Sequence, residues 1–172
     1  MAVSTLSVSG PNRPKIYRGG SQVGYELSYG ANLEANSSTF TTSHFVYSNA
    51  GAITAADDTT GALGLACKAA TEVTSGNIQI PVAVVLPGDL IMIRVEDGSG
   101  NLEASDTTCV VGKAYGLAAY TANTEARADS AEVTNEMLIY LGPVLDAAGD
   151  SSYWGWFAPD VSGAKWQSME GS

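Results

Sequence analysis

The side chains that could do chemistry in this sequence are few and lie far apart. His44 is the only histidine, and no Ser/Asp constellation accompanies it in its strand-like run of residues. Because histidine is the usual acid–base and metal-binding side chain near neutral pH, a single copy leaves few options for either chemistry. We therefore expect His44 to be a structural or surface residue.

The motifs of common enzymes are also missing. The sequence contains no G-x-S-x-G, H-E-x-x-H, G-x-G-x-x-G or Walker A pattern, and RGGSQVG (18–24) lacks the lysine of a phosphate loop. A PGD turn (87–89) before a strand also occurs in β-rich peptidases of the signal-peptidase type. Lys113 could formally serve as their base, but no Ser-Met nucleophile motif precedes it at the required distance. The sequence predicts a protein that is not an enzyme and binds no cofactor.

Two acidic turns resemble metal sites without matching one. Oxygen-bearing side chains alternate at Asp97, Ser99, Asn101 and Glu103, as they do in a calcium loop. An EF-hand requires Gly at the sixth position and Glu at the twelfth, where this chain has Leu102 and Thr108. A hairpin turn explains this run, and Asp57-Asp58 fits a solvated turn better than a catalytic carboxylate pair. We expect no metal site.

The two cysteines, Cys67 and Cys109, lie in apolar, strand-like surroundings. The chain has no C-x-x-C pair and no Cys/His cluster with metal-site spacing. We expect two buried free thiols, with a disulfide between them as the alternative.

The composition indicates which elements carry these residues. The chain has 172 residues, of which 45% are apolar, enough for one domain with a core. Nineteen glycines, eight tyrosines and many Ser, Thr and Val residues favour an all-β class with turn-rich connections. Only 15% of the residues are charged. A surface with so few charged groups favours packing against neighbouring molecules.

The charge is unevenly distributed along the chain. The net charge is −10, and Arg13, Lys15 and Arg18 lie in the first 20 residues, which contain no acid. The acidic remainder argues against nucleic-acid binding, which depends on neutralising phosphates. Three cations suit a tether that lies on an acidic protein surface. We expect an extended N-terminal arm over 1–20 and a β-rich domain over 21–172.

The segment IPVAVVLPGDLIMIRVEDGSGN (80–101) has the clearest pattern. One strand face is predicted at Ile78, Ile80, Val82, Val84 and Leu86, and another at Ile91, Ile93 and Val95. Leu90 and Met92 are apolar on the opposite face. The second strand is therefore expected to be covered on both sides, by the core and by either a loop or a neighbouring subunit. Pro81 favours an edge position or a bulge.

Weaker patterns predict the other elements. We expect strands over 39–48, 107–121 and 133–147, the last broken at Gly142-Pro143, and a hairpin over 95–107. Residues 62–73 fit a strand or a short helix, and residues 122–132 fit a solvated loop or a short helix.

The C-terminal segment concentrates aromatic residues: Tyr153, Trp154, Trp156, Phe157 and Trp166. They could pack in the core or at an edge, contact another protein, or form a platform that stacks on sugars. Alternation places Trp154 and Trp156 on one face and Phe157 on the other.

No apolar run approaches the roughly 20 residues of a membrane span. The N-terminus lacks the basic and apolar blocks of a secretory signal. We expect no membrane association, and folding in a cytoplasm.

Taken together, the basic arm, the acidic Gly/Ala/Thr-rich β-domain and the stretch IPVAVVLPGDLIMIRVEDGSGNLEASDTTCVVGKAYGLA resemble the capsid decoration (cement, or auxiliary head) proteins of tailed bacteriophages. The likeness covers residues 76–145 best and the arm more loosely. It implies a β-barrel or β-tulip domain on the outer capsid surface of the virion, often trimeric. Its arm would run over the major capsid protein and add a strand to it.

Two groups of residues are our candidates for such binding. The capsid-binding arm comprises Arg13, Lys15, Ile16, Tyr17 and Arg18, and the subunit or partner contacts are Leu90, Met92, Trp154 and Trp156. The expected function is to stabilise a capsid by bridging major capsid protein subunits, as a homo-oligomer assembled in the host cytoplasm. The alternative is a carbohydrate-binding or fibre-type β-sandwich adhesion module that uses Trp154 and Trp156.

Overall fold

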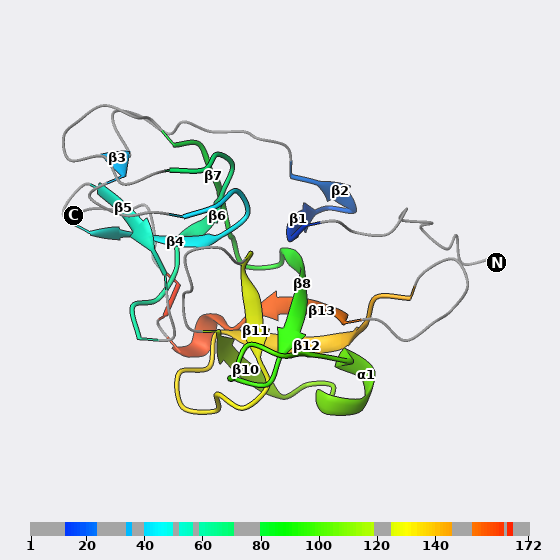
Figure 1. Cartoon of the computed structure of the whole chain (residues 1–172). Coiled ribbons are helices and arrows are strands. Elements are labelled where there is room, and N and C mark those ends of the chain that lie inside the picture. Colours follow the sequence, from blue (N-terminus) through cyan, green and yellow to red (C-terminus); the bar gives the residue numbers. More distant parts are fainter. Residues whose placement is uncertain are drawn as a thin grey trace.

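The protein is an all-β molecule built from two sheets (Figure 1). The computed structural model describes residues 13–23, 34–35, 40–49, 52–56, 59–70, 80–118, 125–145, 153–163 and 165–166. No helix within these ranges is long and apolar enough to cross a membrane.

The larger sheet has eight strands and closes on itself. Its members are β1 (Lys15–Arg18), β2 (Ser21–Gln22), β8 (Leu90–Glu96), β9 (Leu102–Glu103), β10 (Ala114–Leu117), β11 (Arg127–Asp129), β12 (Leu138–Pro143) and β13 (Trp154–Pro159). They follow the order β11-β10-β12-β13-β8-β1-β2, with β9 beside β8. Because β11 also pairs with β8, in parallel, the five strands from β11 to β8 form a closed barrel. The expected β-barrel is confirmed.

The smaller sheet lies beside the barrel (Figure 1). It contains β3 (Glu34–Ala35), β4 (Phe45–Asn49), β5 (Ala52–Ala55), β6 (Gly64–Ala66) and β7 (Val82–Val84), in the order β3-β5-β4-β6-β7. The turn between β7 and β8 leads from this sheet into the barrel. Two short helices complete the described elements, α1 (Ser105–Thr108) and the 3₁₀ helix η1 (Val161–Gly163).

One hydrophobic core joins the two sheets. As predicted, Ile91, Ile93 and Val95 point into the barrel, where all three side chains are fully buried. The same cluster contains Phe45 and Leu65 from the smaller sheet. A second cluster, which includes Phe40, Val46, Ile53 and Val82, is confined to the smaller sheet and its loops.

Two predicted elements differ from the structure, and one open alternative is resolved. Residues 127–129, expected in a loop or short helix, form β11, because Ala126 and Ala128 point inward while their neighbours face out. Residues 62–73, which were ambiguous, contain strand β6. The long strand expected over 107–121 is shortened to β10, since α1 and a turn at Val111-Gly112 take up its first half.

The strand expected over 133–147 is present as β12, with an irregularity close to the predicted break. Its register against β13 shifts between Tyr140 and Gly142. Such a bulge bends a strand at the wall of a barrel. The strand expected over 39–48 begins later, as β4, and Phe40 instead makes an isolated bridge to Ala70.

The expected arm ends earlier than residue 20, because residues 15–18 form β1 of the large sheet. Ile16 pairs with Ile91 and Tyr17 with Leu90, and Ile16 is only 2% exposed. The burial of Ile16 and the backbone pairing with the edge of β8 hold this segment in place. Gly19 and Gly20 have φ values of 57° and 84°, which a tight turn from β1 into β2 requires. Residues 1–12 lie outside the described ranges.

Candidate interaction surface

Several predicted contact residues do gather on one face of the barrel. Side chains alternate along a strand, so the residues between Ile91, Ile93 and Val95 point away from the interior. Cross-strand pairing aligns Lys15 with Met92, Met92 with Trp156, and Tyr17 with Leu90. We call the members of this set that reach solvent the outer face and define it as Lys15, Tyr17, Leu90 and Trp156.

Members of the outer face differ in accessibility. Leu90 is 41% exposed, whereas Tyr17 and Trp156 are half-buried and pack edge to face with ring centroids 5.2 Å apart. Met92 is fully buried against Val144 and Trp154, so the segment that follows β12, and not another subunit, covers it. The prediction of Met92 as a partner contact is therefore wrong.

Trp154, which was also predicted to be a partner contact, is not accessible, although it lies beside the outer face. Its side chain is 6% exposed, and the Arg94 guanidinium lies 4.8 Å from the centroid of its ring. A cation over an indole covers the face that would otherwise stack on a ligand. Trp154 therefore contributes packing beneath Arg94 and presents no open aromatic surface.

The remaining aromatic residues of the C-terminal segment mostly pack inward. Phe157 is fully buried, and Trp166 packs edge to face on Phe45 while donating a hydrogen bond from Nε1 to the Met137 carbonyl at 2.9 Å. Core packing is thus the correct interpretation for these two residues. Tyr153 is 50% exposed.

The predicted arm residues also have different roles. Ile16 belongs to the core, and Arg18 forms an ion pair with Asp89 at 2.8 Å. Asp89 is the acidic residue of the PGD turn (87–89), so this ion pair gives the motif a structural role. Lys15 and Tyr17 belong to the outer face, and Arg13 is half-buried just before β1.

The seam that closes the barrel carries a cluster of charges that sequence reasoning missed. Arg94 of β8 lies opposite Arg127 of β11, and Glu96 lies opposite Asp129. Like charges that face each other are unfavourable, and two oblique ion pairs offset this. Arg94 contacts Glu125 at 2.7 Å, and Arg127 contacts Glu96 at 3.0 Å. The alternation of charge with alanine in EARAD (125–129) was the only available signal.

Burial perturbs the two glutamates in this seam. The pKa of the Glu96 carboxyl is raised because burial disfavours its charged form, and the nearby Arg127 offsets this only in part. The pKa of Glu125 is raised for the same reason, against the influence of Arg94. Both pKa shifts arise because the two glutamates are buried where β8 and β11 close the barrel.

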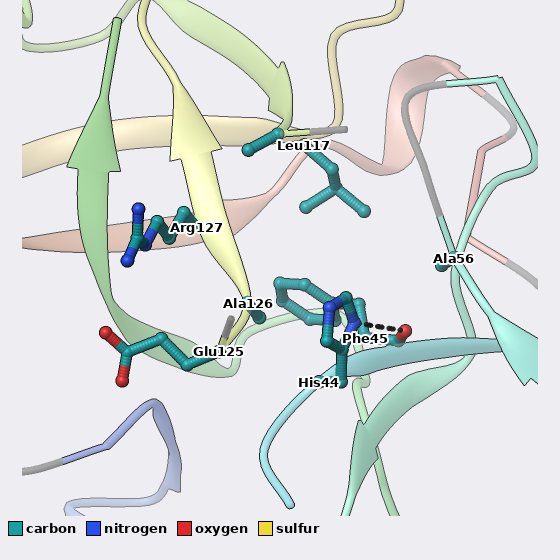
Figure 2. A pocket seen from close by; sticks show the side chains of 8 residues that line it. His44, Phe45, Ala56, Leu117, Glu125, Ala126 and Arg127 are labelled. Carbon is teal, nitrogen blue, oxygen red and sulfur yellow. Dashed lines mark hydrogen bonds between the residues drawn. The ribbon is translucent and has the colours of Figure 1, made fainter. Parts of the chain in front are cut away.

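A small cavity lies between the end of the barrel and the smaller sheet (Figure 2). Its lining includes His44, Phe45, Leu117, Glu125 and Arg127, and its volume is about 10 Å³, close to that of one water molecule. In Figure 2 the charged ends of Glu125 and Arg127 point away from His44. Burial lowers the pKa of His44, whose Nδ1 lies 3.2 Å from the Phe45 carbonyl oxygen. This cavity is too small for an organic ligand.

The remaining candidates for chemistry have structural partners. Asp97 accepts hydrogen bonds from the backbone N–H groups of Ser99 and Asn101 and from the Asn101 side chain, which closes the predicted turn. Cys67 and Cys109 are free thiols, the first half-buried and the second buried. The prediction of free thiols is therefore confirmed for both cysteines, and the prediction of burial is confirmed for Cys109.

Neither a protein-family model, nor a curated protein, nor a solved structure matches this chain. Without such a match, we base the proposed function on the outer face and on residues 1–12, which precede β1 in the sequence.

Proposed function

We propose that this protein is a structural protein that binds the outside of a phage capsid and stabilises it by bridging major capsid protein subunits. The outer face and residues 1–12 would make the contacts, and the protein would act as a homo-oligomer on the virion surface. Neither the outer face nor the rigid barrel needs a ligand or cofactor for this role.

The observation that carries the proposal is the chemistry of the outer face. Apart from Lys15 its members are apolar or aromatic, and none is acidic, in a chain with a net charge of −10. The outside of a small barrel is ordinarily polar, and an exposed apolar patch marks an interaction site. A partner surface that offers apolar groups beside a carboxylate would complement Leu90, Trp156 and Lys15.

The position of β1 supports a second contact. Residues 1–12 come shortly before β1 in the sequence, and β1 contributes Lys15 and Tyr17 to the outer face, so we propose that the N-terminal segment contacts the same partner. An extended segment gains affinity when its backbone adds to a sheet edge. On a symmetric shell many such weak contacts act together.

The carbohydrate-binding alternative receives less support. It needs Trp154 and Trp156 as an open platform, but Arg94 covers the Trp154 ring and Trp156 contacts Tyr17 by an edge. Stacking on a sugar would require Arg94 to move away.

The experiment that tests the proposal is co-sedimentation with empty, undecorated capsids from the same source. The deletion must stop at residue 12, because removing residues 1–20 would also remove Ile16 from the core. We expect saturable binding by the full chain, and binding weakened by about tenfold or more without residues 1–12. No sedimentation of the full chain would refute the proposal.

A further inference from the structure

The contact between the smaller sheet and the seam of the barrel contains the only histidine of the chain. His44 lies directly before β4, and it is only 3% exposed. The carbonyl of the preceding residue, Ser43, accepts a hydrogen bond from the Ala126 backbone N–H at 3.2 Å. Ala126 directly precedes β11, so this bond connects the two sheets. We call Ser43, His44 and Ala126 the joint.

The joint contains a strained residue. Ser43 has a φ of 68°, a left-handed conformation that residues other than glycine rarely adopt. Two hydrogen bonds hold it there, because its N–H donates to the Ala66 carbonyl at 2.6 Å and its carbonyl accepts from Ala126. A strained conformation persists only while its surroundings impose it. Loss of the bond to Ala126 would therefore let the joint relax.

The His44 ring is bound in its neutral form. Its Nδ1 lies 3.2 Å from the Phe45 carbonyl oxygen (Figure 2), which also accepts from the Ala56 backbone N–H at 2.8 Å. Because a carbonyl oxygen can only accept, Nδ1 carries the proton of the neutral ring, and a second proton would go to Nε2. That proton would place a positive charge inside the joint.

The surroundings of the ring are poorly suited to this charge. The adjoining cavity, of about 10 Å³, has room for about one water molecule. Of the described residues that line it, only Glu125 and Arg127 carry a charge, and both charged ends point away from His44 in Figure 2. Glu125 is already paired with Arg94 at 2.7 Å, and Arg127 has the same sign of charge as an imidazolium. Burial accordingly lowers the pKa of His44 from its ordinary value of 6.5.

We infer that the joint is an acid-sensitive contact, in which proton uptake by His44 breaks the bond between Ala126 and Ser43 while both sheets stay folded. Opening lets the charged ring reach water. Because the folded pKa lies below the ordinary value, the closed joint is fully favoured above about pH 6.5 and loses stability as the pH falls through the folded pKa. This inference is independent of capsid binding.

Amide hydrogen exchange at pH 7.5 and pH 5 tests the inference, with rates expressed as protection factors so that the intrinsic pH dependence cancels. The informative amides are those of Ser43 and Ala126, and the amides of β12 and β13 report the barrel. His44→Asn cannot take up a proton and keeps an N–H donor for the Phe45 carbonyl. Glu125→Gln is the matched control, since it removes the carboxyl that lines the same cavity.

We expect acidification to lower protection at Ser43 and Ala126 by about tenfold or more in the wild type, because only the open joint accepts the charged ring. Glu125→Gln should keep this response, and His44→Asn should lose most of it. Protection in β12 and β13 should not fall with that of the joint.

Unchanged protection of the joint in the wild type would overturn the inference. A response that is kept in His44→Asn and lost in Glu125→Gln would assign the effect to Glu125 instead. An equal loss of protection in the joint and in β12 and β13 would show unfolding of the whole molecule and not local opening.

A second measurement decides the matter if His44→Asn does not fold. The single histidine gives one ring Hε1 resonance, so an NMR titration of the wild type follows His44 directly. A midpoint well below 6.5 would support the inference, and a midpoint at or above 6.5 would contradict it.

Discussion

Burial sets the reactivity of individual side chains on this scaffold, and Cys109 is the clearest case. Its thiol is 7% exposed, and burial together with the nearby Glu103 raises its pKa to about 11. Because the thiolate is the reactive form, only about one molecule in a thousand would carry it at pH 8.

We predict that iodoacetamide at pH 8 modifies Cys109 far more slowly in the folded protein than in urea. Peptide mass spectrometry after timed quenching measures both rates. Cys67, which is half-buried, provides an internal comparison and should react faster. Equal rates for Cys109 in the folded and unfolded protein would contradict this burial.

Glu96 predicts a pH dependence of stability at the same scale. Its folded pKa lies above the ordinary value of 4.5. A carboxyl with a raised folded pKa contributes stability that is fully present below its unfolded pKa and is lost as the pH rises through its folded pKa.

The free energy of unfolding of the wild type, relative to Glu96→Gln, should therefore fall as the pH is raised from 4 to 7. Glutamine cannot ionise, so the variant reports the same fold without this titration. Urea unfolding at a series of pH values measures the difference. A difference that grows with pH would show that the ion pair with Arg127 outweighs the cost of burial.

At the scale of elements, close approach between strands β6 and β7 depends on Gly64. A Cβ at this position would collide with the Ala83 backbone carbonyl, and neither strand can move far because both are paired. Gly64→Ala should lower the free energy of unfolding by about 3 kcal/mol.

Gly100→Ala is the matched comparison for this prediction. Its φ is +90°, but no atom lies within 4 Å of the added methyl group. It should cost about 1 kcal/mol, from backbone strain alone. Equal costs for the two variants, measured by urea unfolding, would show that the β6–β7 contact relaxes easily.

Some strands and contacts could be predicted from the sequence, and others could not. β8 was predictable because large side chains alternate with period two, so that Ile91, Ile93 and Val95 mark the core. β11 was not, since its buried position is held by Ala128, and alanine carries little hydrophobic signal. The Arg18–Asp89 pair spans 71 positions, and no local pattern can reveal such a contact. Trp154 was assigned to the surface because the sequence does not show that Arg94 covers its ring.

For the whole molecule, the shared core predicts cooperative unfolding. Phe45 and Leu65 of the smaller sheet pack with the barrel interior, and Trp166 packs against the same cluster. Loss of one sheet would therefore expose the core of the other.

Urea unfolding followed by tryptophan fluorescence and by far-ultraviolet circular dichroism should give coincident transitions. The fluorescence reports Trp154, Trp156 and Trp166, whereas the dichroism reports both sheets. Two separated midpoints would indicate that the sheets unfold independently.

At the scale of the whole molecule, we propose that the outer face docks on a capsid. Leu90→Glu places a carboxylate at the most exposed apolar residue of this face, and Val111→Glu places the same group on a turn outside it, where the native side chain is 65% exposed. Both variants should keep the thermal midpoint of the wild type to within about 5 °C.

Co-sedimentation of the wild type and these two variants with undecorated capsids is the most direct measurement. We expect saturable binding by the wild type and by Val111→Glu, and binding weakened at least about tenfold in Leu90→Glu. Equal binding by all three proteins would place the contact elsewhere on the molecule, and no binding by any of them would contradict the capsid role itself.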